Sequence, residues 1–152
     1  ARKLLSENGY TSYAANYPKN IPTRGYGASG LTEDERLRST LFALFPTQVA
    51  SLAASLLVSL SIFPISAGQI RVKWTMSTYG KDLSEGTIAD RISFCFDVNR
   101  EDREKLERMQ IGLASKHALS GPLAEEDYEG TVRDFQLWLA TQDRKHSFRE
   151  RF

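Results

Sequence analysis

The sequence has very few of the residues that build local metal sites. Its 152 residues include one cysteine, Cys95, and two histidines, His117 and His146, which stand far apart in the chain. One cysteine excludes an internal disulfide, a cysteine-rich zinc site and an iron–sulfur cluster held by this chain alone. The histidines lack the close spacing of a local metal motif, so we expect neither to be a ligand. The composition is typical of a reduced protein of the cytoplasm.

Net charge is also nearly absent. The chain has 20 Lys and Arg residues against 19 Asp and Glu residues, which gives +1 at pH 7. Positive charge gathers only in the two short ends, which is typical of solvated termini. Because no strong basic field is available to attract phosphates, we do not expect a nucleic-acid partner.

A long apolar run that could span a membrane is missing as well. Residues 49–65 carry no charge, but four serines and Pro64 interrupt them. The run is also shorter than the ~20 apolar residues that a spanning helix needs. From Leu56 onward it alternates with a period of two, which indicates a strand. We therefore expect no membrane role.

Alternation and turn residues predict an antiparallel sheet in the first half of the chain. The expected strands are 40–46, 48–53, 56–62 and 69–77. Ala67 and Gly68 form a turn signal, so the last two strands should pair as a hairpin. The side chains expected on its one buried face are Leu56, Val58, Leu60, Ile62, Ile70, Val72, Trp74 and Met76.

The second half changes to a helical period. Ser84 is a candidate N-cap, and Asn99 either opens a second helix or continues the first. A final helix is expected from about Ala124. The apolar stripes expected along these helices are Ile88, Ile92, Cys95 and Phe96, then Leu106, Met109 and Leu113, and last Tyr128, Val132, Phe135 and Leu139. Strands followed by helices predict an α+β fold.

The start of the chain gives no clear periodicity. Residues 1–30 are rich in Gly, Tyr, Asn and Pro, which predicts loop. Thr32 and Glu35 have the spacing of a capping box, which favours a short helical turn. A long loop at the opening of a compact domain is uncommon. We therefore expect 1–30 to be a lead-in from an upstream part of the same domain, and 31–152 to form the main part.

A family resemblance appears at residues 99–110, NREDREKLERMQ, followed by a GPL turn and the Trp-bearing segment FQLWLA. With LFALFPTQVASL upstream, this resembles the C-terminal part of the catalytic domain of Rieske-type non-haem iron oxygenases. These are the large (alpha) subunits of aromatic-ring-hydroxylating dioxygenases and their relatives. The resemblance covers about residues 40–143. It implies a helix-grip-like fold, in which a curved antiparallel sheet packs on a long C-terminal helix, here as a partial domain.

The resemblance also implies a chemistry for the complete protein. Fe(II) and dioxygen would hydroxylate an apolar, often aromatic, substrate. Electrons would come from a reductase or ferredoxin through a [2Fe–2S] cluster in a domain that this chain lacks. Members of the family are commonly homo-oligomers, so a homo-oligomer is expected here.

The resemblance implies a role in the site for three residues, Asp102, Ile92 and Phe96. Its motif N-R-x-D-x-x-x-x-E-x-x-Q places the carboxylate ligand of Fe(II) at Asp102, with Glu107 completing the pattern. The segment that bears Ile92 and Phe96 would border the substrate pocket. The residues alone leave another interpretation open. If Asn99 caps a helix, Asp102 takes position N3, where the helix dipole stabilises any acid, and Ile92 and Phe96 are ordinary core. No catalytic residue is assigned.

The chain also departs from the family pattern. It lacks the H-x4-H stretch of the two histidine ligands and the C-x-H and C-x-x-H pairs of the Rieske cluster. We therefore expect it to be inactive by itself, as a fragment or as a divergent iron-free relative. Two rival functions stay open, namely a non-catalytic helix-grip module that binds a small apolar ligand and a structural assembly domain.

Overall fold

The computed structural model describes residues 2–16, 28–80, 84–119 and 121–149 and has an α+β fold. Six strands form one antiparallel sheet in the order β1-β2-β3-β4-β5-β6, so each strand pairs with its neighbours in sequence. The predicted fold class, α+β with a helix-grip-like curved antiparallel sheet, is confirmed, and the sheet is open and followed by two long C-terminal helices. The elements are β1 (Arg2–Glu7), β2 (Tyr10–Asn16), α1 (Glu33–Arg36), β3 (Arg38–Leu44), β4 (Gln48–Leu52), β5 (Leu56–Ser66), β6 (Gln69–Thr78), α2 (Glu85–Leu113) and α3 (Glu126–Arg149).

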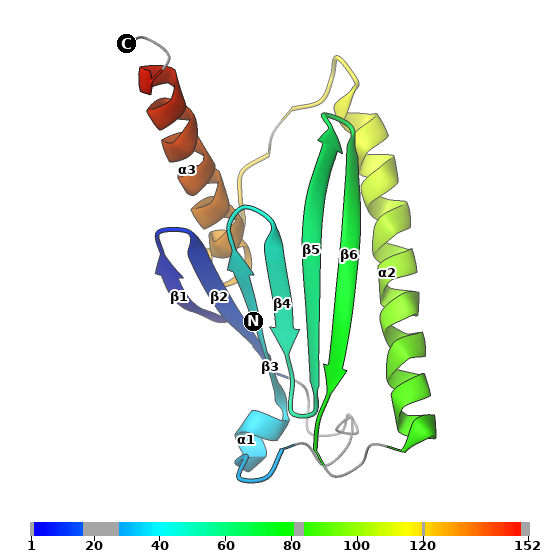
Figure 1. Ribbon diagram of the computed structural model, residues 1–152. Helices are drawn as coiled ribbons and strands as arrows, with labels where there is room; N and C mark the ends of the chain where they lie inside the picture. Colours follow the sequence, from blue (N-terminus) through cyan, green and yellow to red (C-terminus); the bar gives the residue numbers. More distant parts are fainter. Residues whose placement is uncertain (1, 17–27, 81–83, 120, 150–152) are drawn as a thin grey trace.

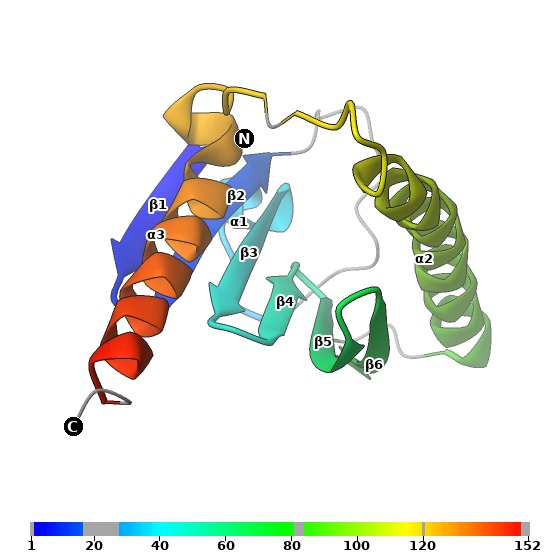
Figure 2. The ribbon, with the colours of Figure 1, turned by 90° about the horizontal axis from the view of Figure 1, so that it is seen from above.

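The two long helices stand at opposite ends of a curved sheet. In Figure 1, α2 runs alongside β6, and α3 lies at the β1 end. Seen from above in Figure 2, the sheet bends between them, with α3 over β1 and β2. Residues from the two ends of the chain therefore meet at the β1 end of the sheet, whereas α2 meets the β6 end.

The expected loop over 1–30 is wrong for residues 2–16, which form the hairpin β1–β2. Gly9 has φ +89°, the left-handed conformation that the tight turn between the two strands requires. The buried residues of β2, namely Thr11, Ser12 and Ala14, are all small, so no alternation of large apolar residues marks the strand. Residues 17–27 lie outside the described residues. The division of the chain at residue 30 stays a prediction.

The β5–β6 hairpin has the predicted register. Leu60 pairs with Trp74 and Ile62 pairs with Val72, which puts both sets of alternating residues on one face. The expected burial of that face is wrong for its outer half, where Val72 is 43% and Ile70 55% exposed. Strand β4 pairs with β5 only as far as Ser61, so the hairpin extends beyond the rest of the sheet.

Helix α2 is one continuous helix of 29 residues. The side chain of Ser84 accepts a hydrogen bond from the Thr87 N–H, so the predicted N-cap is confirmed. Asn99 continues this helix and does not open a second one. Asp102 is therefore inside α2 and not at position N3, which excludes the helix-dipole explanation for an acid there. Pairs three and four residues apart support the continuous helix, namely Arg100–Asp97, Arg103–Glu107 and Lys105–Glu101.

Helix α3 packs on the sheet by a different face from the one expected. Gly130 is buried, and Phe135 and Trp138 pack against Phe45 with ring centroids 5.3 and 5.7 Å away. Of the predicted stripe, Phe135 is correct. The other three members, Tyr128, Val132 and Leu139, are exposed. The small Gly130 lets the helix approach β1 closely, which turns this face inward and the larger apolar residues outward.

The chain leaves a large surface in contact with solvent. Its accessible area is 11807 Å², against about 7,800 Å² for a compact monomer of its mass. Many apolar side chains of β5, β6 and α2 contribute to this surface. Among the described residues, none of the helices is long and apolar enough to cross a membrane.

Candidate functional site

Helix α2 meets the sheet through an aromatic pair. The rings of Trp74 on β6 and Phe96 on α2 lie 5.1 Å apart between centroids, edge to face at 81°. Ile92, one turn before Phe96, is half-buried, and Phe96 is 58% exposed. The structure therefore brings Phe96 onto the apolar face of the β5–β6 hairpin. An edge-to-face pair that stays open on one side is a surface to which an apolar molecule can bind.

The first half of α2 is held at the β4–β5 turn. Arg91, 4% exposed, donates from Nη1 to the carbonyl oxygen of Ser55 at 3.3 Å. Cys95, one turn further along the helix, is also buried, as expected for a small apolar side chain. These two buried positions define the side of α2 that faces the sheet.

Asp102 lies on that same side of α2. It follows Cys95 by about two helical turns, and residues two turns apart share one face of a helix. Its side chain is exposed to solvent. Residue 102 thus shares the side of α2 that Arg91 and Cys95 define, in a stretch of the helix where residues 101–113 are all exposed.

The described residues do not form a complete metal site. No three His, Cys, Asp or Glu side chains among them come close enough together to hold an ion. His117 is exposed, in the connection between α2 and α3. The side chain of His146 is not among those described. Because the parts of the chain described here supply no imidazole beside Asp102, they do not fit a 2-His-1-carboxylate centre, and we derive no chemical step through iron from them.

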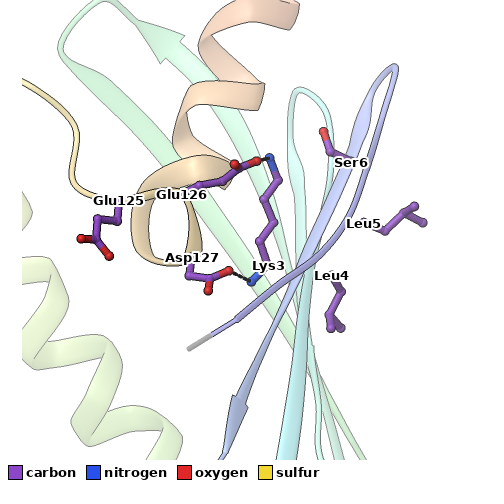
Figure 3. Close-up of a pocket in the computed structure, with 7 residues that line it drawn as sticks. All are labelled: Lys3, Leu4, Leu5, Ser6, Glu125, Glu126 and Asp127. Atoms are coloured by element: carbon purple, nitrogen blue, oxygen red, sulfur yellow. Dashed lines mark hydrogen bonds and ion pairs between the residues drawn. The ribbon is translucent and has the colours of Figure 1, made fainter.

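A cavity of about 540 Å³ lies between β1 and the start of α3. The residues that line it are Lys3, Leu4, Leu5, Ser6, Glu125, Glu126 and Asp127. Figure 3 shows the Lys3 side chain reaching toward Glu126, while Leu5 points away from the helix. The sequence analysis did not single out these residues. Their signal is three consecutive acids, residues 125–127, one residue after the GPL turn.

Lys3 ties this cavity to the sheet. Its Nζ lies 3.2 Å from Glu126 Oε1 and 3.0 Å from Asp134 Oδ2. Its backbone N–H donates to Asp127 Oδ1 at 3.1 Å. The buried Thr11 hydroxyl donates to Asp134 Oδ2 at 2.8 Å. The cluster thus joins β1 and β2 to the first turns of α3.

Both charges of the Lys3–Asp134 pair are favoured by their surroundings. Burial lowers the pKa of Lys3, but hydrogen bonds and charges from Asp134 and Glu126 outweigh it and leave the pKa raised. Burial raises the pKa of Asp134, but hydrogen bonds from Thr11 and Lys3 outweigh it and leave the pKa lowered. Lys3 is therefore a permanent cation near neutral pH. Its charge offsets the acids of the cavity.

A family model described as "Ring hydroxylating alpha subunit (catalytic domain)" matches residues 7–143. The chain belongs to this family. The match begins at the end of β1 and runs into α3, so it includes the whole aromatic pair, Asp102 and the acidic start of α3. A comparison with curated proteins finds no match.

Membership in the ring-hydroxylating alpha-subunit family confirms the resemblance found in the sequence. The match extends the resemblance upstream from about residue 40 to residue 7, into the β1–β2 hairpin. The family consists of non-haem iron oxygenases, which supports an oxygenase-type function for the complete protein. The two features that the structure offers to such a domain are the aromatic pair on the sheet face of α2 and the acidic cavity beside β1.

Proposed function

We propose that the full-length protein is a Rieske-type ring-hydroxylating oxygenase and that this chain forms part of its catalytic domain. The observation that carries the proposal is the family match over residues 7–143. Fe(II) and dioxygen would hydroxylate an apolar, often aromatic, substrate. Electrons would come from a reductase or ferredoxin through a [2Fe–2S] cluster held outside this chain. The protein would be a cytoplasmic homo-oligomer.

In this proposal Ile92 and Phe96 line the substrate pocket. Both lie on the half of α2 that approaches the sheet, and Phe96 already contacts Trp74. An aromatic wall recognises an aromatic ring by its shape and edge-to-face preference, without a specific polar contact. The residues of this chain would thereby bind and orient the substrate.

Asp102 is the proposed carboxylate ligand of Fe(II), and the two imidazoles would come from parts of the protein other than the described residues. Its place on the sheet-facing side of α2 supports the proposal. Iron, when bound, would supply the activation of dioxygen. Asp127, which lines the cavity beside β1, is the competing carboxylate.

The alternative is a non-catalytic module of the same fold that carries a small apolar ligand. The Trp74–Phe96 pair serves this function equally well, because burial of an apolar ligand needs no metal. The two functions therefore differ in one measurable property, which is stoichiometric iron bound by the full-length protein.

The deciding experiment compares three alanine variants of the full-length protein, Asp102→Ala, Asp127→Ala and Asp97→Ala. We expect Asp102→Ala to lose bound iron and product formation while its free energy of unfolding changes by less than about 0.5 kcal/mol, because the side chain is exposed. Asp97→Ala removes another exposed acid of α2 and is the matched control, which should keep both. Iron is measured by metal analysis after anaerobic loading.

Two results would change the proposal. If Asp127→Ala loses iron and Asp102→Ala keeps it, the carboxylate ligand lies in the β1–α3 cavity and the role of Asp102 is rejected. If the unaltered full-length protein binds an aromatic probe but takes up no iron, the oxygenase proposal fails and the binding module replaces it.

A further inference from the structure

We infer that Arg91 is a positioning residue, which holds α2 on the β4–β5 turn so that Phe96 meets Trp74. The inference deepens the proposed function. Its predicted effect on KM rests on the proposed role of Phe96 in the substrate pocket. The predicted placement of α2 by Arg91 does not depend on that role.

The β4–β5 turn is fixed from several directions. Its own closure is a hydrogen bond from the Ala53 N–H to the Leu56 carbonyl oxygen at 2.8 Å. The Tyr79 hydroxyl donates to the Ala53 carbonyl oxygen, and the Tyr79 N–H donates to Ser55 at 3.1 Å. Arg91 uses the same Ser55 oxygen. Because the backbone atoms of this turn cannot move without breaking these bonds, and Ser55 is buried, the turn is a rigid support for the helix.

Burial along α2 shows that its anchorage is confined to the first half. Arg91 and Cys95 are the buried residues of the helix, and residues 101–113 are exposed throughout. Phe96 follows Arg91 by about 7 Å along the helix axis. A tilt of about 10° at Arg91 would therefore move Phe96 by about 1 Å, and more distant residues by more. Displacements of this size are enough to impair the positioning of a substrate.

Arginine suits this task better than lysine. Its guanidinium is planar and carries several donors in fixed directions, and its charge is permanent. A lysine at this position would keep the charge, but its single ammonium group is flexible and does not present donors in the fixed directions of a guanidinium. The conservative change Arg91→Lys therefore tests positioning separately from charge.

The test uses the full-length protein labelled with 5-fluorotryptophan and observed by ¹⁹F NMR. Trp74→Phe assigns the Trp74 resonance, and Phe96→Ala shows where it lies when the ring contact is lost. We expect Arg91→Lys to move the Trp74 resonance toward its position in Phe96→Ala. The Trp138 resonance, from a ring that packs on Phe45, should stay in place and so report an intact β1 end.

The kinetic arm measures the oxidation of an aromatic substrate. We expect Arg91→Lys to raise KM about tenfold with little change in kcat, since a displaced wall weakens binding more than it alters the reacting centre. The matched control is Arg103→Lys, an exposed arginine of the same helix, which should leave KM and the Trp74 resonance unchanged.

An unmoved Trp74 resonance in Arg91→Lys overturns the inference, even if KM rises. A moved resonance with an unchanged KM supports the positioning by Arg91 and rejects the proposed substrate role of Phe96. If the Arg91 variant also loses the Trp138 signal because it fails to fold, Tyr79→Phe carries the test. That variant removes one hydrogen bond to the same turn. Its Trp74 resonance should then move toward the position found in Phe96→Ala, and a resonance that does not move would show that the inference is wrong.

Discussion

Lys3 and Asp134 form an ion pair with 3.0 Å between Nζ and Oδ2, although 131 residues separate them in sequence. The pair joins the first strand of the sheet to the last helix. The two side chains are only 15% and 14% exposed, so solvent screens their attraction less than it screens that of a surface pair. The contact is thus a main fixing point of α3 on the sheet.

Removal of the lysine charge should loosen this fixing point. We expect Lys3→Met to lower the free energy of unfolding by about 2 kcal/mol, because it leaves Asp134 partly buried without its cation. The loss stays below the 3–5 kcal/mol of fully buried pairs, because both groups keep some contact with water. Urea denaturation measures it. Lys105→Met, which breaks the exposed pair with Glu101, is the control and should cost less than about 0.5 kcal/mol. Equal losses in both variants would contradict the importance of the Lys3 pair.

The same pair predicts how stability depends on pH. The pKa of Asp134 is lowered from 3.8, so the unfolded chain takes up its proton first as pH falls. The stabilisation is therefore present above about pH 4 and is lost as pH drops through the folded pKa. The pKa of Lys3 is raised from 10.5. The contribution of Lys3 to the free energy of unfolding is therefore present below pH 10.5 and is lost as pH rises through the folded pKa. The free energy of unfolding, followed from pH 6 down to pH 2, should fall less steeply in Lys3→Met than in the unaltered protein. Parallel curves would show that the pair does not govern acid stability.

Local signals predicted the parts of the fold that local interactions decide. The alternation from Leu56 to Met76 fixed the hairpin face, because a slip of one residue would turn the whole set over. The capping box of Thr32 and Glu35 forms both of its predicted hydrogen bonds. Ser84 begins α2 as expected. Each of these features depends on residues close to one another in the chain.

Distant partners decided what the sequence could not show. The face that α3 presents depends on Gly130 and on the reach of Lys3 from β1, and neither is visible in the period of the helix itself. Thr11 of β2 is buried, and its hydroxyl donates a hydrogen bond to Asp134 from the other end of the chain. The candidate site, too, depends on residues that lie far apart in the sequence. The motif pointed to Asp102 on an exposed stretch of α2, whereas the acidic cavity arises only when β1 and α3 come together.

The packing at Gly130 gives a further prediction. In a helix interior, alanine is normally favoured over glycine by about 1 kcal/mol. A Cβ at Gly130 would lie 2.8 Å from Glu126 Cγ and 3.2 Å from Lys3 Cδ. Glu126 can rotate away only by giving up its ion pair with Lys3, and Lys3 is also held by its ion pair with Asp134. We therefore expect Gly130→Ala to lower the free energy of unfolding by about 1 kcal/mol, since overpacking outweighs the helix preference.

Two comparisons decide whether Lys3 is the cause of that loss. Gly112→Ala lies in α2, where a Cβ meets nothing within 4 Å, and it should raise the free energy of unfolding by about 0.5 kcal/mol. In a Lys3→Ala background the obstructing Cδ is gone, so the added methyl at position 130 should cost at least about 0.5 kcal/mol less than it does in the presence of Lys3. A double-mutant cycle from urea denaturation measures this difference. Strict additivity would mean that Glu126 alone resists the methyl group and that the close approach of β1 to α3 tolerates a larger residue.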